Sequence, residues 1–274
     1  MTQLPPGQRK VDGFPRFGGP AKPPTVPADP ALEITGAVRE PVTVPLSVLS
    51  TLPRTEQTSD FHCVAGWSAI GLRWAGVGFT AFYRSIIEPQ LPQRAAVTHI
   101  VFRGLDGYRA VVFLEDALQT DVMLADRLDD EPLSLKHGAP LRLVSPQQYG
   151  YLNAKHLCAI EVHTSAPPIP LNLVLFRQHP RARVWREERN GKLPTMLVRP
   201  IYRSLTRPFM RRSARGNWDW LRRQGQSNGP CHRVAGNPRC NRDRRAARTA
   251  RHGLTGVSRT GPPYSVRGND ALRP

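Results

Sequence analysis

One cysteine of this chain is surrounded by residue types that suit a redox metal. Cys63 follows His62, and Gly66 and Trp67 come shortly after it. A thiolate is a soft ligand that suits redox-active metals. A lone cysteine in an apolar stretch, however, is more often a small buried side chain. Taken by itself, the pattern around Cys63 favours a structural role and leaves a metal site as the alternative.

Two further clusters combine glycine with hydrogen-bond donors. In the first, His137 and Arg142 stand on either side of a Gly-Ala-Pro turn, and in the second, Asn153 and Lys155 follow a Tyr-Gly-Tyr turn. Glycine permits a close backbone approach, and asparagine and lysine offer N–H donors to an anion. Either cluster alone is more typical of an ordinary surface turn than of a binding site.

Taken together and in order, these motifs resemble a known family. They are similar to the molybdopterin-dependent oxidoreductases of the sulfite oxidase superfamily, in particular to its small bacterial cytoplasmic members. The motifs that carry the resemblance are residues 4–8, 12–18, 60–64, 66–68, 71–77, 102–108, 137–144, 149–151 and 179–189. The resemblance therefore covers about residues 3–209, and its specificity comes from the ordered set.

The resemblance implies a cofactor, a metal ligand and a reaction class. A molybdopterin would supply two sulfurs to molybdenum, and Cys63 would supply a third. The cofactor would carry a two-electron transfer of an oxygen atom, while the protein would ligate and orient it. The fold implied is the α+β, sulfite-oxidase-type fold with mixed β-sheets and short helices.

The resemblance also implies which residues line the cofactor pocket. The pterin carries a phosphate, so donors and positive charge are expected around it. Besides Cys63, the matching positions are Arg16, His62, Gly104, His137, Arg142, Asn153, Ala154 and Lys155. Gly104 and Ala154 can contribute only backbone groups.

One position departs from the family pattern and bears on the substrate. Asp126 stands where animal and plant sulfite oxidases have a tyrosine, and we expect it to be catalytic. A carboxylate near the metal would repel sulfite. A small S-oxide or N-oxide is therefore as good a candidate as a sulfite-like substrate. The chain shows no haem or flavin motif, which implies a separate electron-transfer partner.

The elements that must position these residues are read from hydrophobic patterning. Residues 79–87 show one apolar helical face that Pro89 ends, and 45–49 form a helical turn. Strands are expected at 32–35 and 157–163, and a hairpin at 97–103 and 108–114. A short helix at 115–118 and strands at 121–128 and 141–144 follow. The mixture lacks a regular βαβ rhythm, which favours an α+β fold.

The positive charge is unevenly distributed along the chain. The net charge is +18, but residues 211–274 alone hold fifteen arginines, no lysine and three acids. We expect an extended arm over 1–30, the oxidoreductase domain over 31–176, its basic extension over 177–210 and a disordered tail over 211–274. The alternative functions are a basic nucleic-acid-binding protein acting through that tail and a cofactor-binding protein with little turnover. Nucleic acid is the less favoured partner.

The remaining cysteines and the N-terminus complete the expectations. Cys158 is expected in the core. Cys231, His232 and Cys240 lack a fourth ligand at zinc-site spacing. Residues 1–6 contain no apolar signal core, and no apolar run reaches the roughly 18 residues of a membrane span. We therefore expect a cytoplasmic protein.

Overall fold

The architecture consists of two β-sheets, and short helical segments connect some of their strands. The computed structural model describes residues 3–15, 24–168, 178–194, 196–204 and 206–208. Within them, strands alternate with short helices that never form a βαβ repeat. The predicted α+β class is confirmed.

The first sheet has five strands in the order β3-β2-β11-β6-β7. Its strands are β2 (Ala31–Gly36), β3 (Val42–Pro45), β6 (His99–Gly104), β7 (Arg109–Phe113) and β11 (Leu157–His163). β2 and β11 run parallel, and the other neighbours run antiparallel. Alternating residues such as Leu32 and Ile34 are buried, as a strand with one face on a core requires. The predicted hairpin and both predicted strands are confirmed here.

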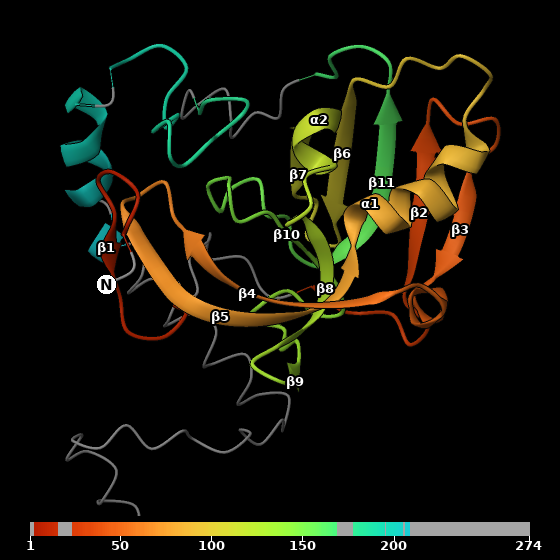
Figure 1. Ribbon diagram of the computed structural model, residues 1–274, viewed down its shortest axis with the longest axis horizontal. Coiled ribbons are helices and arrows are strands. Elements are labelled where there is room, and N and C mark those ends of the chain that lie inside the picture. The colour runs from red at the N-terminus through yellow and green to blue at the C-terminus, as the bar shows by residue number, and fades with distance from the viewer. Residues whose placement is uncertain (1–2, 16–23, 169–177, 195, 205, 209–274) are drawn as a thin grey trace, which may run out of the picture. The chain divides into compact units, whose positions relative to one another are not determined.

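The second sheet has six strands and carries most of the candidate site. It contains β1 (Arg9–Lys10), β4 (Arg54–His62), β5 (Trp67–Gly78), β8 (Met123–Leu128), β9 (Glu131–Pro132) and β10 (Arg142–Val144). β4 and β5 form a long antiparallel hairpin that curves across the lower part of Figure 1. The sequence analysis placed no strand over residues 54–59, because this first part of β4 is almost entirely polar.

The helical segments are short. Within residues 24–168 they are η1 (Leu46–Thr51), α1 (Phe79–Phe82), the π-helical η2 (Tyr83–Ile87), η3 (Glu88–Gln90) and α2 (Leu114–Ala117). A further helical stretch covers residues 196–204 and 206–208. The predicted helix over 79–87 and the turn entered through Pro45 are confirmed. Pro89 does not end the helical run, since proline is tolerated in the first turn of η3. Figure 1 shows α1 lying across the five-stranded sheet, where Phe79 packs on Phe102 with ring centroids 5.1 Å apart.

The buried apolar side chains form two clusters. The larger one includes Leu32, Phe82, Ile100 and Ile160. The smaller one, called here the Cys63 cluster, lies on the six-stranded sheet. Its buried members are Cys63, Ala65, Trp67, Ala69, Leu72, Trp74, Met123, Ala125, Leu133 and Val144. Cys158 belongs to neither; it is half-buried because it alternates outward on β11, so the expectation of a core position was wrong.

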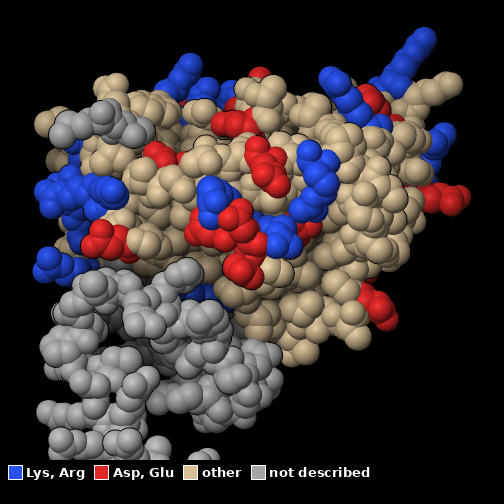
Figure 2. Space-filling model, turned by 60° about the horizontal axis from the view of Figure 1, so that its bottom comes forward, with Lys and Arg blue, Asp and Glu red and all other residues tan. Residues whose placement is uncertain are grey.

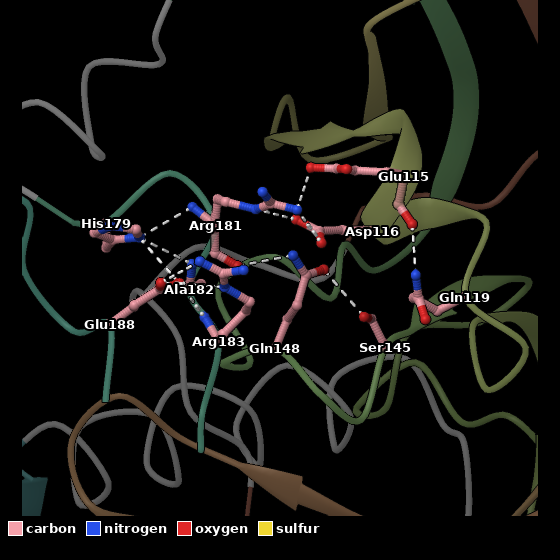
Figure 3. A network of polar contacts seen from close by, with 10 residues as sticks. All are labelled: Glu115, Asp116, Gln119, Ser145, Gln148, His179, Arg181, Ala182, Arg183 and Glu188. Atoms are coloured by element: carbon pink, nitrogen blue, oxygen red, sulfur yellow. Dashed lines mark hydrogen bonds and ion pairs between the residues drawn. The ribbon is translucent and has the colours of Figure 1, made fainter. Parts of the chain in front are cut away.

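The segment of residues 178–194, which follows β11 in the chain, is fixed to α2 by Arg181 and closed on itself by Arg183. Arg181 binds the carboxylate of Asp116 on α2 with two hydrogen bonds of 2.9 and 2.6 Å, and Arg183 pairs with Glu188 (Figure 3). The amide of Gln148 donates to the Arg181 carbonyl at 2.9 Å. This attachment carries the chain back toward the Cys63 turn.

The described surface is mixed in charge where Figure 2 shows it. Acidic and basic side chains lie side by side in the middle of this face. Arg73 of β5 forms an ion pair of 2.6 Å with Asp130. The arginine-rich residues 211–274, with Cys231, His232 and Cys240, lie outside the described residues, as does Arg16. In the described part of the chain, no helix is long and apolar enough to span a membrane.

Candidate functional site

Cys63 lies in the tight turn that joins β4 to β5. Its N–H donates to the Trp67 carbonyl at 2.8 Å, and the Gly66 N–H donates back to the Cys63 carbonyl at 2.9 Å. Gly66 has φ +94°, which favours glycine at this position. We call residues 63–66 the Cys63 turn. Its closure is the local reason that Cys63 points into the sheet's apolar cluster.

The Cys63 side chain is buried and protonated in the metal-free chain. Only 5% of its surface is exposed. Burial raises the pKa of Cys63 to about 12, against smaller opposing effects from a backbone hydrogen bond at Ala65 and the charge of Arg189. A thiol in this environment becomes a thiolate when a cation binds it.

A chain of buried hydrogen bonds holds the Cys63 turn from one side. The Gln8 side-chain amide donates to the Cys63 carbonyl at 3.1 Å, and the Ser68 hydroxyl donates to Gln8 Oε1 at 3.0 Å. His62 Nδ1 lies 2.7 Å from the same hydroxyl and therefore donates to it. Burial lowers the pKa of His62 and keeps its ring neutral. His62 thus frames the turn here, and its direct contact with a cofactor stays a prediction.

Arg142, at the start of β10, is a fully buried cation. It is 0% exposed, and one of its terminal nitrogens, Nη2, has no hydrogen-bond partner in the described structure. Its Nη1 donates to the His137 carbonyl at 2.9 Å. Among the described residues, no acidic side chain pairs with it. Burial lowers its pKa to about 9, so it stays charged at neutral pH.

Three aromatic rings surround the Arg142 guanidinium. Its Cζ lies 4.9 Å from the Trp74 centroid, 5.6 Å from Phe61 and 5.7 Å from Phe14. Trp74 belongs to the Cys63 cluster, and Phe61 and Phe14 pack against it. The rings therefore connect the buried cation with the side of the sheet that holds Cys63.

Other basic side chains gather beside Arg142. We call Lys136, His137, Arg142 and Lys155 the basic cluster. The His137 ring stacks on Phe14 with centroids 4.8 Å apart, and its Nδ1 is buried without a partner in the described structure. Burial and then the charges of Lys155, Lys136 and Arg142 lower the pKa of His137 to about 2. A neutral imidazole among three cations marks a place where an anion would be stabilised.

Glycines allow the parts of the basic cluster to approach one another. A Cβ on Gly104 would lie 2.4 Å from the Lys155 carbonyl oxygen. A Cβ on Gly138, whose φ is +110°, would lie 3.1 Å from Lys155 Cβ and 3.2 Å from Arg142 Cβ. The structure therefore brings together four predicted site residues, namely Gly104, His137, Arg142 and Lys155.

Asn153 and Ala154 immediately precede Lys155 of the basic cluster. Asn153 Oδ1 accepts from the Ser145 N–H at 2.7 Å, and its amide nitrogen points at the carbonyls of the same turn. Ala154 is buried, with its N–H bonded to Leu152 and its carbonyl accepting from Leu143. These groups already have protein partners, so their predicted cofactor contacts stay predictions.

Asp126 is not brought to Cys63 by any contact of the described structure. Its carboxylate is bound by both terminal nitrogens of Arg54 at 2.6 and 2.8 Å. Arg54 begins β4, whereas Cys63 follows the end of that strand. Asp126 also alternates away from Ala125, a member of the Cys63 cluster. A catalytic role for Asp126 has no geometric support here.

Sequence reasoning missed several residues that shape the site. Gln8, Ser68 and Arg189 contact the Cys63 turn or its supports, but they come from distant parts of the chain. Trp74 and Phe61 stand in motifs of the resemblance, but the sequence analysis gave them no role in the site. No local pattern marks such contacts, because they form between segments that are 55 to 125 residues apart.

Comparisons with known proteins identify the family of the chain. The family model described as the oxidoreductase molybdopterin binding domain matches residues 21–169. The chain is 33% identical over 136 residues to a "Putative protein-methionine-sulfoxide reductase subunit YedZ1" of Azospira oryzae, covering 50% of each. It is 30% identical over 130 residues to "Uncharacterized oxidoreductase YuiH" of Bacillus subtilis, covering 47% of this chain and 63% of that protein.

A mitochondrial sulfite oxidase of Drosophila melanogaster is 32% identical over 162 residues, covering 50% of this chain and 27% of that protein. The sulfane dehydrogenase SoxCD of Paracoccus pantotrophus superposes with a TM-score of 0.43 at 22% identity, covering 50% of this chain and 39% of the other. The chain spans about half the length of most of the curated relatives it matches. Because the family model covers more than half of the chain, the protein belongs to the oxidoreductase molybdopterin-binding domain family, within the sulfite oxidase superfamily.

Proposed function

We propose that this chain holds molybdopterin between Cys63 and the basic cluster and transfers an oxygen atom from a small S-oxide or N-oxide. The observation that carries the proposal is Arg142, a buried guanidinium without an acidic partner in the described structure. A buried charge without compensation costs several kcal/mol. An anionic ligand at this position would supply the missing partner.

The residues present fit the cofactor of the family. Arg142 Nη2 and His137 Nδ1 are buried polar atoms without a partner among the described residues, and both belong to the basic cluster. A guanidinium offers a planar pair of donors to a phosphate. Lys136 and Lys155 add positive charge, as their effect on the pKa of His137 indicates. We assign the phosphate end of the cofactor to this cluster.

Cys63 supplies the protein's sulfur ligand in this proposal. The bound molybdenum centre supplies the two-electron exchange that accompanies oxygen-atom transfer. Binding a cation releases the proton of Cys63 Sγ, because a metal ligand must be deprotonated. The apolar side chains around Cys63 exclude water from that sulfur, and the bonded turn fixes its direction.

The apolar character of the Cys63 cluster favours a neutral substrate. Trp67 and Leu133 are buried in the same cluster as the proposed ligand. A sulfoxide loses less hydration free energy than sulfite when it enters such surroundings. Relatives named as methionine-sulfoxide reductase subunits and as a sulfite oxidase both match the chain. We therefore place an S-oxide first and sulfite second.

The reaction requires electrons from another molecule. We propose a separate electron-transfer partner, since the sequence carries no haem or flavin motif. Reduction of an S-oxide consumes two electrons and two protons and releases water. An artificial reductant can replace the partner in an assay.

The proposal is tested by loading and turnover. The full chain, made in a host that synthesises molybdopterin, should contain molybdenum and pterin in near-equal amounts. It should oxidise a reduced dye when methyl sulfoxides are added, and do so faster than it reduces an acceptor with sulfite. Purified protein that contains no molybdenum, or that contains molybdenum but no pterin, contradicts the proposal.

The nucleic-acid alternative makes a different prediction. Residues 211–274 lie outside the described residues, so their role stays a prediction. A chain shortened to residue 210 that keeps molybdenum and turnover supports the enzyme. Salt-sensitive DNA binding without any metal would favour the alternative.

A further inference from the structure

A second buried arginine lies behind the Cys63 turn. Arg189 is only 1% exposed. It belongs to the segment 178–194, beyond the residues 21–169 that the family model covers. Arg181 fixes the earlier part of this segment to Asp116 on α2, and the Arg183–Glu188 pair closes the segment on itself. Arg189 therefore contacts the Cys63 turn from a part of the chain outside the residues that the family model matches.

The two ends of the Arg189 guanidinium bind two different segments. Nη1 donates to the Val64 carbonyl within the Cys63 turn, and Nη2 donates to the Pro6 carbonyl in the N-terminal arm at 3.2 Å. Its Cζ lies 5.0 Å from the Tyr149 ring centroid. A single side chain thus joins the turn, the arm and the segment 178–194.

The packing around these contacts leaves little free space. A Cβ on Gly7 would lie 2.9 Å from Arg189 Nη2, and a Cβ on Gly66 would lie 3.1 Å from the Gly7 carbonyl oxygen. Each of these glycines has a positive φ. The arm and the turn therefore meet backbone to backbone, with the guanidinium beside the contact.

The positive charge of Arg189 is only partly compensated. Its acidic neighbour, Glu187, lies 3.8 Å away, and that carboxylate is bound more closely by Arg199, whose Nε donates to it at 3.0 Å. Arg189 Nε is buried without a partner in the described structure. An excess of positive charge therefore remains next to the turn that carries Cys63.

We propose that Arg189 is a positioning residue for the metal ligand: it holds the Cys63 turn through the Val64 carbonyl and provides the charge that compensates the Cys63 thiolate. The inference rests on the proposed function, in which Cys63 ligates molybdenum. Partners that orient a metal ligand commonly change metal affinity by about 10- to 100-fold when they are removed. Arg189 acts through the turn and touches neither substrate nor metal.

Three variants of the full chain separate this role from simple attachment of the segment. Arg189→Met removes the charge and the donors but keeps an apolar side chain of similar length. Arg189→Lys keeps the charge but cannot bind both carbonyls with one planar fork. Arg183→Met is the matched control, because it weakens the same segment through Glu188 without touching the turn.

The readouts are the rate of molybdenum loss during dialysis, the midpoint potential of the bound metal and the split between KM and kcat. Arg189→Met should lose metal about 10- to 100-fold faster, with a lower midpoint potential and an unchanged KM for the sulfoxide. Arg189→Lys should restore the potential and only part of the retention. Arg183→Met should match the unaltered chain.

Each result has a defined meaning. Wild-type retention and potential in Arg189→Met would overturn the proposal, as would equal metal loss in Arg183→Met. If Arg189→Met fails to fold, Arg189→Lys is the deciding variant. If Arg189→Lys retains molybdenum as well as the unaltered chain does, the planar guanidinium is not required and the proposal is wrong. Full molybdenum in a Cys63→Ser variant would instead overturn the proposed function on which this inference rests.

Discussion

The Cys63 turn and the basic cluster are organised in opposite ways. The turn is closed by its own backbone and held by Gln8, Ser68 and Arg189. The basic cluster leaves Arg142 Nη2 and His137 Nδ1 buried without partners in the described structure. The proposed metal end is therefore formed before any ligand arrives, whereas the proposed anion end has unpaired donors that a ligand would complete. Substitutions at the two ends should consequently affect stability and cofactor binding in different proportions.

The largest contrast is expected from Arg142→Met. Cofactor retention should fall by about 10- to 100-fold, because the planar donor pair to the phosphate is lost. The cofactor-free chain should become more stable by about 1–4 kcal/mol, since an apolar side chain replaces a buried cation. Denaturant unfolding of the cofactor-free chain and pterin retention by the loaded chain measure the two effects.

Arg103→Met is the matched control for that experiment. Arg103 is about half exposed and pairs with Glu161 on the surface of the five-stranded sheet. It should leave both quantities nearly unchanged. A cofactor-free Arg142→Met chain that is less stable than the unaltered chain would show that the anion end is already satisfied.

The second prediction concerns the turn and has the opposite sign in the cofactor-free chain. Ser68→Ala leaves His62 Nδ1 and Gln8 Oε1 buried without their shared partner. The free energy of unfolding should fall by about 1–3 kcal/mol. Ser50→Ala, which removes an exposed bond to the Ser47 carbonyl, is the control and should cost less than about 0.5 kcal/mol. Equal unfolding midpoints for the two variants would contradict the described support.

A third prediction uses pH to distinguish the two ends. The pKa of His137 is lowered to about 2 in the folded chain by burial and by its basic neighbours. The unfolded chain therefore takes up a proton near pH 6.5 that the folded chain refuses, so His137 costs stability progressively as the pH falls below about 6.5. His137→Gln should reduce the loss of stability between pH 7 and pH 5.

The remaining loss in that variant has an identified source. Burial also lowers the pKa of His62 and of His99, so some acid sensitivity should persist. Thermal melts across this pH range measure the difference between the two chains. Identical pH profiles would mean that the His137 ring is accessible to protons in the folded state.

The smallest effect is expected at Asp126. Arg54 and Asp126 are 41% and 32% exposed, so their ion pair should contribute at most about 1 kcal/mol. Asp126→Asn should lower stability by no more than that and leave molybdenum content unchanged. A large loss of kcat with normal metal content would restore the catalytic role that the sequence analysis expected.

How far the sequence predicted this fold depends on the pattern in each element. The strands at 32–35 and 157–163 and the helical run from Phe79 were predicted, because apolar residues recur there at strand or helix spacing. β4 was missed over most of its length. Its exposed and half-buried positions carry Thr, Glu, Gln and Ser, which give no apolar alternation.

The candidate site was predictable only in part for a related reason. Cys63, His137 and Arg142 stand in motifs that can be recognised along the chain. Whether they lie near one another depends on the rings of Trp74, Phe61 and Phe14, which come from separate segments. The Asp126 carboxylate is bound by Arg54, which lies 72 residues away in the sequence, and no local pattern indicates this pairing.

The measurement that tests the central claim most directly is molybdenum and pterin content in Cys63→Ser, beside Cys158→Ser as the control for loss of a thiol. The account predicts that Cys158→Ser carries both components at the level of the unaltered chain. Cys63→Ser should lose the molybdenum while the basic cluster still retains some pterin. A Cys63→Ser protein with undiminished molybdenum would contradict the assignment of this sulfur as the ligand.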